Sequence, residues 1–99
     1  MEVRFADARL QRLETDPGFV AREFSQDVVR SFRKKMQFIR AATDERDFYG
    51  MKSLHFEKLQ GDRSHQRSMR LNNQWRLILE FETGPGGKVV VVMKIEDYH

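Results

Sequence analysis

The chain contains no cysteine, which excludes disulfide bonds and thiolate chemistry. No apolar run approaches the ~18–20 residues of a membrane span, so we expect no membrane contact. The opening segment MEVRFADARL carries acidic residues and lacks the apolar stretch of a signal peptide. Together these absences predict a cytoplasmic protein.

Metal-ligand patterns are also missing. The sequence has neither an HxxxH motif nor a paired-carboxylate signature, so we expect no metal ion and no other cofactor. Repeats, linkers and low-complexity tracts are absent, and the 99 residues predict one domain spanning residues 1–99. The 18 basic and 15 acidic residues give a net charge of +3, which by itself does not imply nucleic acid.

The first half of the chain has mainly helical spacing. MEVRF alternates apolar and charged residues and predicts a short strand, after which Asp7 is suited to cap a short helix. Asp16 followed by Pro17 suits the start of a long helix within residues 17–42. The apolar stripe of this helix is Phe24, Val28, Phe32, Met36 and Ile39. TDERDFYG predicts a further helical turn closed by Gly50.

The second half changes from a period of 3.6 to a period of two. SLHFEKL, RSMRL, WRLILEF and KVVVVMKI are four strand candidates, separated by turn-forming segments. The last strand is apolar on both faces, which predicts an interior place in the sheet. The order predicts an α+β fold, with an N-terminal strand and two helices packed on one face of a mainly antiparallel sheet.

The NNQ segment predicts a specific hairpin register. A three-residue loop over residues 72–74 pairs Leu71 with Trp75 and keeps apolar side chains on one face. The same register places Arg70 directly opposite Arg76 on the other face, where like charges repel.

Two interpretations of this arginine pair remain open. An anion such as phosphate held between the guanidiniums would remove the repulsion. Alternatively, both side chains extend into water, or each pairs with a glutamate such as Glu80 or Glu57.

Two further segments carry candidate functional groups. The loop EKLQGDRSHQR supplies Lys58, Arg63 and Arg67 near the hairpin, as either a cradle for a nucleic-acid backbone or a solvated polar loop. The chain ends in Asp97, Tyr98 and His99, which offer an acid or base, an aromatic ring or proton donor, and a group that titrates near neutrality. Asp97 and His99 share parity along an extended segment, so we expect both to point at one site. The alternative is that the tail has only a packing role.

The pattern as a whole resembles the HigB branch of the RelE/ParE toxin superfamily over nearly the full chain. The most specific parts are Leu59-x-Gly61, Ser68-x-Arg70, Asn72, Trp75-Arg76 and the terminal Asp97-Tyr98-His99. The resemblance implies a small α+β toxin that cleaves mRNA in the ribosomal decoding site without a metal. It also implies a helix-turn-helix antitoxin of the HigA kind, through which alone the toxin would meet operator DNA.

The resemblance also assigns roles to residues. Arg76 matches the arginine expected to contact the scissile phosphate, and Asp97, Tyr98 and His99 match the terminal catalytic group. The chain departs from a common LHPLKGD version of the motif, since it has Glu57 in place of His and Gln60 in place of Lys. His55 and Lys58 lie nearby, with His55 expected on the strand face of Glu57. We expect Arg70, Lys58, Arg63, His55 and Arg67 to bind RNA or phosphate.

Two other functions compete with the nuclease. A toxin of the ParE kind shares the fold and inhibits DNA gyrase without a nuclease site, but it has no need of a terminal DYH. An RNA-binding module without catalysis would need an aromatic stacking surface, whereas most aromatic residues here are expected in the core.

Overall fold

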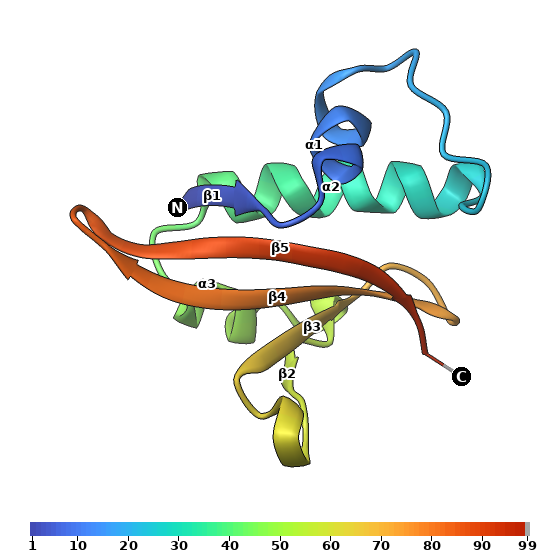
Figure 1. Cartoon of the computed structure of the whole chain (residues 1–99). Coiled ribbons are helices and arrows are strands. Elements are labelled where there is room, and N and C mark those ends of the chain that lie inside the picture. Colours follow the sequence, from blue (N-terminus) through green and yellow to red (C-terminus); the bar gives the residue numbers. More distant parts are fainter. Residues whose placement is uncertain (99) are drawn as a thin grey trace.

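The computed structural model describes residues 1–98, in which helices α1 and α2 pack on one face of a five-stranded sheet, with α2 running alongside β5 (Figure 1). The strands and helices, with two short 3-10 turns η1 and η2, are β1 (Glu2–Phe5), α1 (Ala8–Thr15), α2 (Gln26–Ala41), α3 (Arg46–Gly50), η1 (Lys52–Leu54), β2 (Glu57–Lys58), η2 (Gly61–Arg63), β3 (Gln66–Arg70), β4 (Trp75–Gly84) and β5 (Gly87–Asp97). None of these helices is long and apolar enough to cross a membrane.

The sheet has the strand order β1-β5-β4-β3-β2, with β1 parallel to β5 and all other pairs antiparallel. The interior place predicted for the last strand is therefore confirmed. Val90 and Val92 point into the main core, while Val89 and Val91 on the opposite face are also buried. The predicted α+β fold with helices on a mainly antiparallel sheet is confirmed as well.

The start predicted for the long helix was wrong. Asp16 ends α1 instead: its backbone N–H donates to the Arg12 carbonyl over 2.8 Å, and its side chain accepts from the Gly18 N–H over 3.0 Å. These bonds close a turn, and α2 begins only after Ser25. Asp7 does cap α1, because its carboxylate accepts a hydrogen bond of 2.8 Å from the Arg9 N–H.

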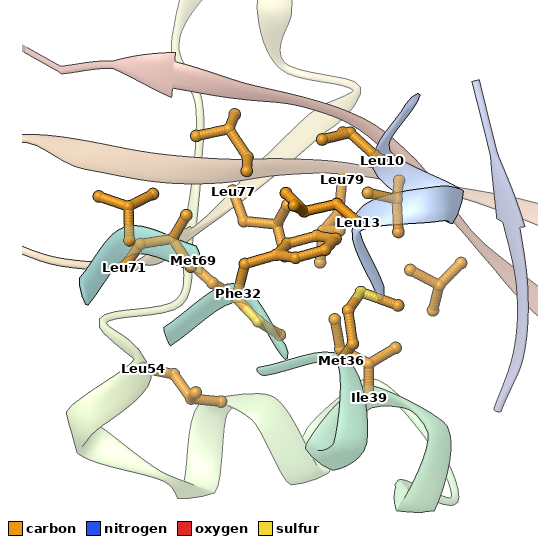
Figure 2. Packing of buried hydrophobic residues seen from close by; sticks show 14 of the residues in the cluster. Leu10, Leu13, Phe32, Met36, Ile39, Leu54, Met69, Leu71, Leu77 and Leu79 are labelled. Atoms are coloured by element: carbon orange, nitrogen blue, oxygen red, sulfur yellow. The ribbon is translucent and has the colours of Figure 1, made fainter. Parts of the chain in front are cut away.

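The core lies between α1, α2 and the sheet. The predicted stripe is fully buried from Val28 through Phe32 and Met36 to Ile39. Figure 2 shows Phe32 packed against side chains of α1 and β4, where Leu77 and Leu79 project toward the helices. Burying this stripe fixes which face of the sheet α1 and α2 cover.

The SLHFEKL segment forms much less strand than predicted. Residues Lys52–Leu54 make a 3-10 turn, and only Glu57–Lys58 form a strand. His55 has a left-handed backbone with φ 46°, so it lies outside the strand and does not share a strand face with Glu57. The strand fails to extend because the turn ends at this left-handed residue.

The register predicted for the NNQ hairpin is confirmed. Met69 pairs with Leu77, and Arg70 pairs with Arg76. The side-chain oxygen of Asn72 accepts hydrogen bonds from the backbone N–H groups of Gln74 and Trp75, at 2.9 and 2.8 Å. Asn72 therefore holds the turn that sets this register.

Candidate active site on the outer face of the sheet

The sheet face turned away from α1 and α2, here called the outer face, carries a row of charged side chains. Residues directly opposite in an antiparallel pair point to the same face. The pairings Arg70 with Arg76 and Arg76 with Glu96 therefore place these three side chains side by side across β3, β4 and β5. Glu57 pairs with Ser68 in the neighbouring row.

Arg76 is buried in this face, and its Nε and Nη2 atoms are engaged by neighbouring acceptors. Its side chain is 9% exposed, and Nη2 donates to Glu57 Oε1 over 2.9 Å, to Ser68 Oγ over 2.8 Å and to the His55 carbonyl over 2.6 Å. Of the two interpretations of the arginine pair, pairing with a glutamate is therefore the one that holds for Arg76, and its partner is Glu57. The fork of donors is held in one orientation by acceptors from three separate segments.

Arg70 has a different environment. Among residues 1–98 no carboxylate lies within ion-pair distance of it. Its Nη1 is 3.4 Å from His55 Nε2, and its Nη2 donates to Asn73 Oδ1. The Arg70 guanidinium is thus a cation next to Arg76, and the described part of the chain does not neutralise the charge of Arg70.

Tyr98 lies over Arg76. The Arg76 Cζ is 5.1 Å from the centroid of the Tyr98 ring, a cation–π distance. The Tyr98 backbone N–H donates to the Gln74 carbonyl over 2.6 Å, which ties the tail to the NNQ turn. Tyr98 is 42% exposed, so the ring covers the arginine and still faces solvent.

Asp97 does not join Arg76 as expected. It pairs with Trp75, which puts it on the helix side of the sheet, and it accepts a hydrogen bond of 3.1 Å from Gln74 Nε2. The cause is a β-bulge: Ile78 pairs with Lys94 but Leu79 pairs with Val92, which leaves one extra residue in β5. A bulge reverses the side of every residue beyond it. His99 lies outside the described residues.

Arg63 reaches the outer face but is neutralised there. Its two terminal nitrogens donate to the two carboxylate oxygens of Glu96 at 3.0 and 2.9 Å. The hydrogen bonds from Arg63, ahead of that from Lys94, hold the pKa of Glu96 below its usual value. The same bonds raise the pKa of Arg63.

Lys58 and Arg67 are not part of the arginine cluster. They pair with each other across β2 and β3, and the register of Arg67 with Leu79 puts both on the side of the sheet that faces the helices. Arg67 Nε lies 3.6 Å from Glu45 Oε2. The expected basic cradle is therefore divided between two faces.

Two residues of this site received no role from the sequence, although Ser68 belongs to the Ser68-x-Arg70 motif. Ser68 is completely buried and supplies its hydroxyl to Arg76, and Glu96 is bound to Arg63. A signal for Ser68 exists, because it lies two positions before Arg70 on the same strand and so shares its face. Glu96 had no such signal, because the bulge decides its side.

Comparison with known proteins identifies the class. The chain matches the family described as the RelE-like toxin of type II toxin-antitoxin system HigB over residues 3–99. It therefore belongs to the HigB-like toxins, and membership of a type II toxin-antitoxin family implies a cognate antitoxin as partner. A search among curated protein sequences finds no match.

Solved structures agree in fold. One is described as a YoeB/ParE toxin from Agrobacterium tumefaciens, with a TM-score of 0.62 and 16% identity over 100% of both chains. A second is YafQ from E. coli strain BL21(DE3), with a TM-score of 0.57 and 9% identity over 97% of this chain and 91% of that one. At these identities the likeness extends to the fold and not to individual site residues.

Proposed function

We propose that this toxin is a ribosome-dependent endoribonuclease that cuts mRNA during translation, uses no metal ion and thereby inhibits translation. The observation that supports this most is the outer face itself, where Arg76 is held rigidly beside Arg70, Glu57 and Tyr98. A fixed guanidinium next to a carboxylate and a second cation is suited to phosphoryl transfer by general acid–base catalysis.

The proposed reaction breaks one phosphodiester bond. A base removes the proton from a ribose 2'-OH, whose oxygen forms a bond to the adjacent phosphorus. The bond from phosphorus to the leaving 5'-oxygen then breaks, and an acid protonates that oxygen. The products are a 2',3'-cyclic phosphate and a 5'-hydroxyl. Arg76 and Arg70 stabilise the negative charge that develops on the phosphate oxygens.

Glu57 is the proposed base. Among residues 1–98 it is the carboxylate that forms an ion pair with Arg76, and its side chain is 55% exposed, so a ribose hydroxyl can reach it. Glu96 is a poorer choice because Arg63 engages both of its oxygens and lowers its pKa. Asp97 faces the other side and serves, in this proposal, to hold the tail through Gln74.

His99 is the proposed acid, since it follows Tyr98 directly and imidazolium donates protons efficiently near neutral pH. Tyr98 stacks on a base of the message next to the cut. Arg70 with His55 holds the scissile or a neighbouring phosphate. Arg63 holds the Glu96 side chain in place on the outer face through two hydrogen bonds. Lys58 and Arg67 would contact RNA only from the far side of the sheet.

The proposed setting follows from the substrate. The toxin acts in the cytoplasm on ribosomes and mRNA, and its antitoxin is a helix-turn-helix protein of the HigA kind. Contact with operator DNA would then come only through the antitoxin.

The test compares one message in two forms, one translated and one with its start codon removed. After toxin expression without antitoxin, primer extension should show cuts within the coding region of the translated form alone. A toxin that lacks His99, expressed at the same level, is the matched control and should cut far less. Equal cutting of both messages would exclude ribosome dependence. Intact mRNA with damaged DNA would favour a gyrase inhibitor instead.

A further inference from the structure

A second feature lies on the other side of the molecule, at the connection between α1 and α2. A cavity of about 280 Å³ lies against the start of α2. Its apolar lining includes Phe19, Val20, Phe24 and Val29. Val20 is 73% exposed, the highest value among the large apolar side chains described. The chain leaves this apolar side chain unburied, so a partner that covers it gains binding energy from its burial.

The charges around this cavity are unbalanced. The acids near it are already engaged, because Glu23 accepts from Arg9 at 2.8 Å and Asp27 accepts from Ser25 and Asn72. In contrast, Arg30 and Lys34 of α2 have no carboxylate partner within the described chain. Arg30 lines the cavity and Lys34 lies one helical turn further along α2, so the two cations form a positive edge that begins at the apolar cavity.

We propose that this cavity and its positive edge are the docking surface for the cognate antitoxin. The chemistry calls for an amphipathic segment with an apolar side chain that enters the cavity beside Val20 and with acidic residues opposite Arg30 and Lys34. An RNA backbone would use the two cations but would gain nothing from an exposed valine and an apolar cavity. The combination of both features therefore favours a protein segment.

The surface also connects to the outer face. The Phe24 ring packs edge-on against Trp75 with centroids 5.5 Å apart, and Asn72 Nδ2 donates to Asp27 Oδ2 over 3.0 Å. Trp75 immediately precedes Arg76. An antitoxin segment on this surface thus sits next to the turn that holds Tyr98, although it leaves the outer face itself uncovered.

The experiment measures the affinity of the full-length toxin for the antitoxin encoded in the neighbouring reading frame, by isothermal titration calorimetry. Val20→Asp and Arg30→Glu should each weaken binding by about tenfold or more, as expected for a central anchor and a charge pair at an interface. Both changes are on exposed positions, and circular dichroism checks that the variants fold. Met51→Asp is the matched control: Met51 is 42% exposed on the opposite part of the chain, and its affinity should stay within about twofold of the unchanged toxin.

A second measurement separates this surface from the nuclease site. Expressed alone, the Val20→Asp toxin should still arrest growth, but co-expressed antitoxin should no longer protect the cells fully. Unchanged antitoxin affinity in both Val20→Asp and Arg30→Glu would overturn the proposal. Loss of ribosome-dependent cutting with unchanged antitoxin affinity would also overturn it, and would assign the surface to RNA.

Discussion

The contrast between Arg76 and Arg70 gives the sharpest test of the site. The two arginines occupy opposite positions of one hairpin, yet Arg76 is buried with three acceptors, whereas the Arg70 side chain within residues 1–98 hydrogen-bonds to His55 and Asn73. Replacing each with glutamine should therefore have unequal effects on the free energy of unfolding. The pair forms its own control, because the register and the strand pairing are shared.

The magnitude for Arg76→Gln follows from its partners. The Ser68 hydroxyl loses a charged donor in a buried place and the His55 carbonyl loses one in a partly buried place, at about 1–1.5 kcal/mol each. Glu57 is 55% exposed, so its carboxylate regains water and adds little. We expect a loss of about 2–3 kcal/mol, which lowers the melting temperature by about 10–20 °C in a domain of this size.

The companion variant Arg70→Gln removes an exposed side chain and one of two facing charges. Its free energy of unfolding should stay within about 0.5 kcal/mol of the unchanged protein. Both variants should cut mRNA less, because each removes a cation from the phosphate site. Arg76→Lys should recover only part of the lost stability, since an ammonium cannot reach three acceptors fixed around a planar fork.

The measurement is thermal and urea unfolding of the three variants beside a cleavage assay. Equal melting temperatures for Arg76→Gln and Arg70→Gln would refute the argument, because they would mean that the acceptors around Arg76 do not stabilise the fold. A large loss for Arg70→Gln would show that this arginine has a structural partner and is not available to phosphate.

Three further outcomes are expected. Asn72→Ala removes two hydrogen bonds within the NNQ turn and one to Asp27, and should cost about 1–2 kcal/mol in urea titrations. An unchanged free energy of unfolding would show that the turn does not depend on the Asn72 side chain. The pKa of Glu96 is lowered in the folded state, so its contribution to stability is present above its unfolded value, near 4.5, and is lost as the pH falls through the folded value. Glu96→Gln should therefore be less stable than the unchanged protein at pH 7, with a difference that shrinks in acid; a constant difference would mean that the Arg63 contact does not act through charge. Removal of His99 should leave melting unchanged and reduce cleavage by about 10²–10⁴-fold, and full activity of that variant would remove His99 from the mechanism.

Local patterns in the sequence were sufficient for much of the architecture. The stripe from Val28 to Ile39 requires a helix with one buried face, and the alternation in the second half requires strands, because each pattern buries its apolar side chains only in that conformation. The NNQ register followed from the same rule, since a shift by one residue would expose Leu71 and bury a charge. The prediction that the long helix starts at Asp16 was wrong because the same residue types favour both helix starts and turns. Here the Asp16 carboxylate accepts a hydrogen bond from the Gly18 N–H within the turn that ends α1.

The site itself depended on the tertiary structure. The acceptors of Arg76 come from a left-handed residue at 55, a two-residue strand and the middle of β3, and no local pattern brings these three segments together. The side taken by Asp97 was decided by the bulge in β5, which adds a residue that the sequence does not mark among its valines. By itself the sequence determined the family, the helices, the main strands and the facing arginines, because these follow from neighbours along the chain. The tertiary structure decided that Arg76 is buried, that Arg70 has no carboxylate partner among residues 1–98 and that Tyr98 lies over Arg76. These outcomes depend on contacts between segments far apart in sequence.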